Sequence, residues 1–198
     1  DQNRSEMRIR VDMHGSELYE VSALVEPLLH WYKENRREMP WRKEASPYHV
    51  WVSEIMLQQT RIEAVIGYYD RFLKQLPDVA ALAAAPEEQI LKLWEGLGYY
   101  NRVRNMQKAA KIMVECYDGY LPADYDLLLE LPGIGSYTAG AIASISYGIA
   151  VPAVDGNVLR VVMRFLGCRD DISRQAVKKK LERSLRQVMP EQEPGRFN

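Results

Sequence analysis

The chain is organised around the stretch Leu131-Pro132-Gly133-Ile134-Gly135-Ser136-Tyr137-Thr138-Ala139-Gly140, a Pro-Gly turn followed by a second glycine and a helix-forming run. Glycine tolerates positive φ and close approach of another backbone, and Ser136 is predicted to cap the helix that follows. The first N–H groups of a helix lack internal partners and carry partial positive charge. The stretch therefore predicts a hairpin of two helices whose donors suit a phosphate oxygen, with an ordinary helix–turn–helix corner as the alternative.

The composition is that of a globular protein. The 198 residues are 47% hydrophobic and 27% charged, which suffices for one domain or two joined lobes. No apolar run approaches the roughly 20 residues that span a bilayer, so we expect no membrane segment. Cys116 and Cys168 lie far apart and outside any metal-ligand spacing. We expect both to be reduced and structural, which fits a cytosolic or nuclear compartment.

Positive charge gathers near the end of the chain, although the net charge is only −1. Residues 160–186 contain nine Lys and Arg against three acidic residues. Such a run is usually a solvated helix face, and a face that follows nucleic-acid phosphates is the alternative. Charge alone leaves both interpretations open.

Apolar spacing predicts an all-α protein with short loops marked by Pro and Gly, and no alternating strand pattern occurs. Residues 1–15 are expected to be a flexible tail, with Ser16 capping the first helix. Residues 39–42 are expected to form a loop that exposes large side chains. Further helices are expected at residues 48–59, 61–76, 78–85, 87–94, 101–117, 125–130, 137–147, 155–165 and 173–188.

Two carboxylates are candidates for chemistry. Glu54 stands in a helix that is apolar on nearly every side, so its pKa is expected to rise unless it pairs with an arginine such as Arg42. A raised pKa suits a general acid at neutral pH. Asp155 opens a helix, where it is either a plain N-cap or a carboxylate placed to stabilise a developing cation. Glycosidic cleavage uses such a pair of carboxyl groups.

Two polar or aromatic groups stand at helix ends. Gln58-Gln59-Thr60 follows the apolar helix, and Tyr99-Tyr100 occupies a turn. They are either an ordinary helix terminus and a packed aromatic corner, or side chains that enter a duplex where a base has left.

Five motifs, in order and spacing, resemble those of the adenine-specific mismatch DNA glycosylase family (MutY) within the helix-hairpin-helix base-excision superfamily. They are Pro40-Trp41-Arg42, the segments WVSEIMLQQT (51–60), LWEGLGYY (93–100) and LPGIGSYTAG (131–140), and VDGNV (154–158). The resemblance covers residues 16–198. It implies a two-lobed helix-hairpin-helix glycosylase fold, with a six-helix lobe at about 38–150 and a second lobe from 16–37 plus 151–198, and a DNA-facing cleft between them.

The resemblance also implies a function in base-excision repair. The enzyme would flip adenine mispaired with 8-oxoguanine or guanine out of double-stranded DNA and hydrolyse its glycosidic bond. Glu54 would protonate the base and then activate water, Asp155 would stabilise the sugar cation, and Tyr137 and Asn157 would support them. The implied adenine pocket comprises Arg37, Met39, Trp41 and Arg42. The implied DNA contacts are Gln58, Gln59, Thr60, Tyr99, Gly133, Gly135 and Ser136.

Tyr137 distinguishes reaction types within the superfamily. Endonuclease III-type glycosylase–lyases carry a lysine at this position, which forms a Schiff base with the sugar. Tyrosine cannot do so, and the sequence therefore predicts a monofunctional hydrolase. A thymine-mismatch glycosylase of the same superfamily and a non-catalytic helix-hairpin-helix DNA-binding module are the alternatives.

The resemblance implies further features beyond residue 198. The four-cysteine motif for a [4Fe–4S] cluster would follow Asn198 in the full-length protein, as would the domain that senses 8-oxoguanine. We expect no metal or cofactor within residues 1–198 themselves. The expected protein is a monomer that contacts DNA and no membrane, in a bacterial cytoplasm near the nucleoid or in a eukaryotic nucleus or mitochondrion.

Overall fold

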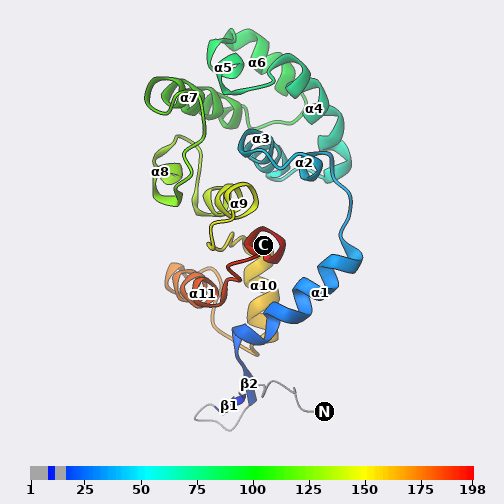
Figure 1. Ribbon diagram of the computed structural model, residues 1–198, viewed down its shortest axis with the longest axis vertical. Coiled ribbons are helices and arrows are strands. Elements are labelled where there is room, and N and C mark those ends of the chain that lie inside the picture. Colours follow the sequence, from blue (N-terminus) through cyan, green and yellow to red (C-terminus); the bar gives the residue numbers. More distant parts are fainter. Residues whose placement is uncertain (1–8, 12–16) are drawn as a thin grey trace.

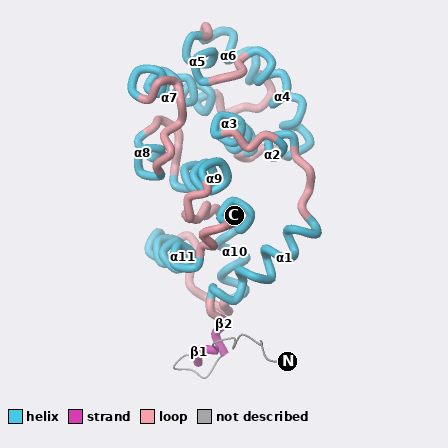
Figure 2. Tube along the Cα trace, in the orientation of Figure 1, coloured by secondary structure: helices cyan, strands magenta, loops and turns pink. Residues whose placement is uncertain are grey.

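The computed structural model describes residues 9–11 and 17–198, and most of this part of the chain is helical (Figures 1 and 2). The all-α expectation is confirmed, apart from a short antiparallel pair, β1 (Ile9–Val11) and β2 (Glu17–Tyr19). Up to residue 116 the helices are η1 (Val21–Leu24), α1 (Val25–Asn35), α2 (Pro40–Lys43), α3 (Pro47–Leu57), α4 (Ile62–Gln75), α5 (Val79–Ala84), α6 (Glu87–Trp94) and α7 (Asn101–Cys116). The remaining helices are α8 (Tyr125–Glu130), α9 (Ser136–Tyr147), α10 (Gly156–Phe165), α11 (Gln175–Val188) and α12 (Pro194–Phe197).

The beginning of the chain differs from the expectation. Ser16, which was predicted to cap the first helix, lies outside the described residues. The helix expected directly after it was wrong, because residues 17–19 pair with residues 9–11 as a strand. The α-helix begins only at Val25, which leaves Pro27 in the first turn, where a missing N–H is tolerated. Of the predicted N-terminal tail, residues 1–8 and 12–15 lie outside the described residues.

A large hydrophobic core is built around α3. Trp51, Val52 and Met56 of this helix are fully buried, and α3 packs against both α4 and α9. Ser46 caps α3 by accepting a hydrogen bond from the N–H of His49, and Pro47 occupies the first helical position. Figure 1 shows α3 between α9 and the arc formed by α4, α5, α6 and α7. A helix surrounded in this way must be apolar on all faces, as the sequence indicated.

A smaller core joins segments from the two ends of the chain. Its buried members come from η1, from the connection before α10, and from α10 and α11: Val21, Leu24, Val154, Leu159, Val162, Leu181 and Leu185. Figure 1 shows α1, α10 and α11 together on the far side of α9 from α3.

Helix α9 is the element that both halves share. A Cβ atom at Gly140 of α9 would lie only 2.4 Å from the carbonyl oxygen of Pro152, so glycine permits the connection to α10 to run close against this helix. Helix α12 also packs on α9, and the Asn198 side chain donates to Ser144 Oγ and to the Val151 carbonyl. The N–H of Ala153 donates back to the Asn198 side chain. These contacts hold the connection that leads directly into α10.

The expected loop at residues 39–42 was wrong. Pro40–Lys43 form the short helix α2, with Pro40 at its first position. Trp41 is only 3% exposed and its ring meets the Tyr69 ring edge-on, with centroids 5.4 Å apart. Burial of the indole in the larger core anchors this segment, and a sequence window of four residues is too short to show such packing. For the same reason, the four-residue α12 was not predicted.

Candidate active site

The site centres on Glu54, which α3 carries into the interior. Its side chain is 5% exposed. The Tyr137 hydroxyl donates a hydrogen bond to Oε2 of Glu54 at 2.9 Å, and Nη2 of Arg42 lies 3.7 Å from Oε1. The two oxygens of one buried carboxyl group therefore face different partners, one from α9 and one from α2.

The surroundings raise the pKa of Glu54 above its usual range. Burial is the largest cause and outweighs both Arg42 and the Tyr137 hydrogen bond, which favour the charged form, while the negative charge of Asp155 adds to the increase. The pKa of the Tyr137 hydroxyl is also raised, chiefly by burial and then by Glu54. Tyr137 thus remains a donor, and Glu54 is a carboxyl group that holds its proton more tightly than a solvated one.

Asp155 lies at the N-terminus of α10. One oxygen of its carboxylate, Oδ1, accepts hydrogen bonds from the N–H groups of Asn157 at 2.9 Å and Val158 at 2.8 Å. The other oxygen, Oδ2, accepts from the Asn157 side-chain amide at 3.1 Å. The predicted N-cap is confirmed, and the negative charge of Asp155 also contributes to raising the pKa of both Glu54 and Tyr137. Asn157 fixes the orientation of this carboxylate.

The hairpin formed by residues 131–140 positions Tyr137. Gly133 has φ +80°, and a Cβ atom there would lie 2.8 Å from Cβ of Asn105, so this turn requires glycine. The prediction that Ser136 caps the following helix was wrong: Gly135 is the N-cap residue, no side chain caps the helix, and Ser136 is its first residue. The backbone N–H groups at the start of this 12-residue helix therefore have no side-chain acceptor, and helix N-termini of this kind favour anions.

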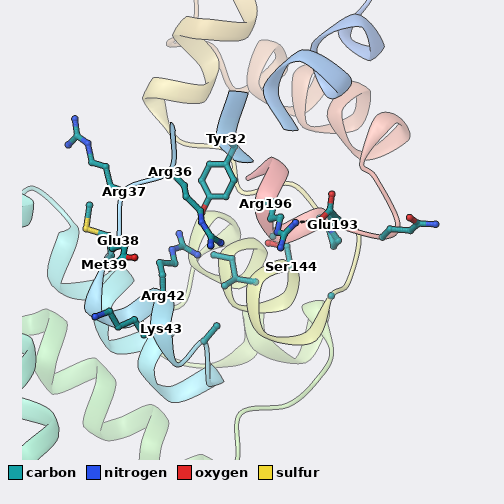
Figure 3. A pocket seen from close by; sticks show the side chains of 16 residues that line it. Tyr32, Arg36, Arg37, Glu38, Met39, Arg42, Lys43, Ser144, Glu193 and Arg196 are labelled. Carbon is teal, nitrogen blue, oxygen red and sulfur yellow. Dashed lines mark hydrogen bonds and ion pairs between the residues drawn. The ribbon is translucent and has the colours of Figure 1, made fainter. Parts of the chain in front are cut away.

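A cavity of about 620 Å³ adjoins the Glu54 site through Arg42. Arg37, Met39 and Arg42 line it, whereas Trp41 is buried in the larger core behind them. Figure 3 shows Arg36 and Arg42 pointing into this space and Arg37 pointing away from it. The remaining lining residues were not predicted as site residues: Tyr32, Arg36, Glu38, Lys43, Ala45, Ser144, Ile145, Gly148, Gln192, Glu193, Pro194, Gly195 and Arg196. They come from α9, α12 and the segments around α1 and α2, so no local pattern could have grouped them.

Gln59 and Tyr99 occupy two exposed corners. Both have left-handed backbone conformations, with φ of 60° and 50°, which are uncommon for residues other than glycine. The Tyr99 side chain is 67% exposed, whereas Gln58 and Thr60 are half-buried beside Gln59. The interpretation of Tyr99 as part of a packed aromatic corner is therefore not supported.

No metal centre is found in the described part of the chain. No group of three or more His, Cys, Asp or Glu side chains there could hold a metal ion. Cys116 is exposed on α7, and Cys168 lies after α10, so the two do not form part of a common ligand set. These residues do not fit an iron–sulfur cluster.

The match to a family model decides the classification. Residues 52–187 match the model described as the HhH-GPD superfamily of base excision DNA repair proteins. The chain belongs to this superfamily. HhH-GPD proteins with solved structures have the same fold: a thermostable thymine-DNA glycosylase matches with a TM-score of 0.80 and 27% identity, over 89% of this chain and 81% of that one. Endonuclease III in a non-covalent complex with DNA matches with a TM-score of 0.74 and 25% identity, over 89% and 80%.

Curated relatives within the superfamily carry the name adenine DNA glycosylase. The human protein is 43% identical over 90% of this chain and 34% of its own length. The protein of Buchnera aphidicola from Acyrthosiphon pisum is 39% identical over 91% of this chain and 51% of its own length. The chain thus spans about a third to a half of these relatives. In the described residues, no helix has the length and apolar character needed to cross a membrane.

Proposed function

We propose that this HhH-GPD chain is the catalytic part of a DNA glycosylase that hydrolyses adenine from mismatches with 8-oxoguanine or guanine. The observation that carries the proposal is the buried Glu54, held between Tyr137 and Arg42 and within the electrostatic influence of Asp155. Similarity of about 40% to adenine DNA glycosylases over nine-tenths of the chain supports adenine as the base.

The two carboxyl groups have different roles in the proposed reaction. Glu54 donates its proton to N7 of the extruded adenine, and the bond between the base nitrogen and the sugar C1′ breaks with its electron pair leaving on the base. The sugar becomes an oxocarbenium-like cation, which the Asp155 carboxylate stabilises. Water then adds to C1′ and gives its proton to Glu54. The products are free adenine and an abasic site, and Glu54 ends in its starting state.

The other predicted residues take supporting positions in this scheme. Tyr137 and Asn157 orient Glu54 and Asp155 through the hydrogen bonds described above. The adenine enters beside Arg42 in the cavity that Arg37 and Met39 also line, with Trp41 as the buried support of this wall. The open N-terminus of α9, with Gly133, Gly135 and Ser136, binds a phosphate. Gln59 and Tyr99 enter the duplex, with Gln58 and Thr60 at their base.

The proposed division into lobes follows the two cores, with residues 38–150 around the larger one and residues 16–37 plus 151–198 around the smaller. We infer that one copy of the chain acts on one mismatch in chromosomal DNA, in a bacterial cytoplasm or a eukaryotic nucleus or mitochondrion.

Base release from defined duplexes tests the function. The purified protein is incubated with duplexes containing A·8-oxoguanine, A·G or T·G, and abasic sites are revealed as strand breaks after alkali. We expect the parent protein to produce breaks in the adenine-containing strand. We expect Glu54→Gln to bind the duplex but to produce no breaks. Preferential cleavage at T·G would instead support the thymine-mismatch activity that the fold similarity to a thymine-DNA glycosylase suggests. Binding without release from any duplex would support the non-catalytic module.

Tyr137→Lys tests the reaction type. The Tyr137 hydroxyl lies 2.9 Å from the Glu54 carboxyl group. In the proposed scheme, a lysine amine brought to this place attacks C1′ and forms a Schiff base. We expect the variant to nick some DNA without alkali and to be trapped on it by borohydride, whereas the parent is not trapped. Trapping of the parent would contradict the hydrolytic mechanism.

A further inference from the structure

Arg102, at the start of α7, uses all four terminal N–H groups of its guanidinium on backbone carbonyls. Nη1 donates to the carbonyls of Ile55 at 2.9 Å and Gln58 at 2.6 Å. Nη2 donates to those of Leu97 at 3.0 Å and Gly98 at 3.1 Å. The first pair lies at the end of α3 and the second in the turn before α7. One side chain therefore joins two corners that are more than 35 residues apart along the chain.

The bonding follows from the ends of the helices. The last carbonyls of α3 have no intrahelical partner, and a cation is favoured near the negative end of a helix. The flat guanidinium presents paired donors in a fixed geometry, which suits two pairs of carbonyls on opposite sides. It also lies 5.5 Å from the ring centroids of Trp94 and Tyr99. Arg102 is thus held by rings as well as by hydrogen bonds.

The corners that Arg102 joins are the two that carry Gln59 and Tyr99. Two of the carbonyls that accept from Arg102 belong to Gln58, the residue before Gln59, and to Gly98, the residue before Tyr99. Gln59, Tyr99 and Asp118 are the non-glycine residues with positive φ in the described part of the chain. A left-handed residue other than glycine is strained and persists only where its surroundings impose it. The Arg102 hydrogen bonds supply that constraint at two of these three positions.

We propose that Arg102 is a positioning residue that holds Gln59 and Tyr99 as one rigid two-pronged unit, so that both enter the duplex together when the adenine leaves it. The proposal rests on the proposed function, because it assigns these two side chains to the duplex. Loosening the unit slows the extrusion of a paired base. It leaves the chemistry at Glu54 unchanged once the base is in the site.

The test compares two substrates for one variant. Arg102→Lys keeps the positive charge, but a single ammonium cannot serve four carbonyls in two corners. Single-turnover release is measured on adenine opposite 8-oxoguanine and on adenine opposite a tetrahydrofuran abasic analogue, where no partner base holds it. The matched control is Arg104→Lys, which changes an exposed arginine on the same helix that pairs with Glu87 on the surface.

We expect Arg102→Lys to lose about 10-fold to 100-fold in rate on the paired adenine and less than about threefold on the unpaired one. The fluorescence rise of 2-aminopurine in place of the adenine slows in parallel, and Arg104→Lys matches the parent in all three measurements. Equal losses on both substrates, or no loss on either, would overturn the proposal. A parent that releases adenine from neither duplex refutes the proposed function instead.

A second variant covers the case in which Arg102→Lys does not fold. Gly98→Ala leaves Arg102 in place but strains the turn, where φ is +70° and no atom obstructs an added Cβ. The proposal predicts the same selective loss on the paired substrate, and equal losses on the two substrates would again overturn it.

Discussion

Replacing Glu54 with glutamine should make the protein more stable at neutral and alkaline pH while removing its activity. Burial raises the pKa of Glu54 in the folded state, so the folded protein binds this proton more tightly than the unfolded chain does. Between the two pKa values, the free energy of unfolding of the parent therefore falls as pH rises. Glutamine has the shape of the protonated acid and no proton to lose, so Glu54→Gln lacks this decrease.

The magnitude follows from the two contacts of the carboxyl group. The Tyr137 hydroxyl can donate to the glutamine oxygen as it does to Glu54, so no buried hydrogen bond is lost. Arg42 is one-third exposed and remains hydrated without its partner. The slope removed is about 1.4 kcal/mol per pH unit between the unfolded and folded pKa values. Burying one poorly compensated charged group costs on the order of 1–3 kcal/mol, and this is the amount by which the free energy of unfolding of Glu54→Gln should exceed that of the parent at pH 8.

Urea unfolding from pH 4 to pH 8 measures this difference. The stability gap between Glu54→Gln and the parent should be near zero at pH 4, grow with pH and then level off. Glu87→Gln, which alters an exposed carboxylate on the surface, should show no comparable growth. The release rate of Glu54→Gln should meanwhile fall by about 10²-fold to 10⁴-fold, the usual contribution of a general acid. A gap that is constant with pH, or a variant less stable than the parent at pH 8, would refute the reasoning.

Four further substitutions test the supports of the site. Tyr137→Phe removes the hydrogen bond that lowers the pKa of Glu54. The fall in release rate on the alkaline side of the pH–rate profile should therefore move to higher pH, and the maximum rate should be lower. A profile that does not move would show that the two groups are uncoupled. Gly140→Ala places a Cβ 2.4 Å from the Pro152 carbonyl, and should cost about 1–3 kcal/mol in urea unfolding as α9 and the connection to α10 move apart. Gly133→Ala should cost a similar amount, because position 133 has φ +80° and an added Cβ would meet Asn105. Gly135→Ala should change the free energy of unfolding by less than about 0.5 kcal/mol, because position 135 has φ −94° and open space around it. Equal effects at the two glycines would contradict the turn geometry.

Local patterns were sufficient for most of the helical framework. The helix around Glu54 is apolar on all sides, which predicts its burial. The Ser46-Pro47 pair predicts where this helix begins. Asp155 was identifiable as an N-cap, because a short acceptor before a helix bonds to N–H groups two and three residues away. The errors lie where pairing or packing with another segment overrides the preference of the residues themselves. Residues 17–19 pair as a strand, and Trp41 is drawn into the core as part of a short helix.

The site itself combines both levels. Its residue types were evident in the sequence, since a carboxyl group in an apolar helix and a tyrosine where a lyase would need lysine both restrict the chemistry. Their contacts were not, because Tyr137 and Glu54 are 83 residues apart. Arg102 illustrates the limit most clearly, since nothing distinguishes it in the sequence from Arg104, two residues further along the helix.

The sequence by itself predicted most of the helices, the apolar helix that carries Glu54 and the Pro-Gly turn at residues 132–133, because each follows from neighbours within one or two helical turns. Only the tertiary structure decided that Tyr137 and Arg42 share the carboxyl group of Glu54, that Asp155 lies within its electrostatic reach, and that Arg102 spans two corners. Such contacts depend on how helices pack, and packing is set by the whole core at once, so no single segment of the chain contains it.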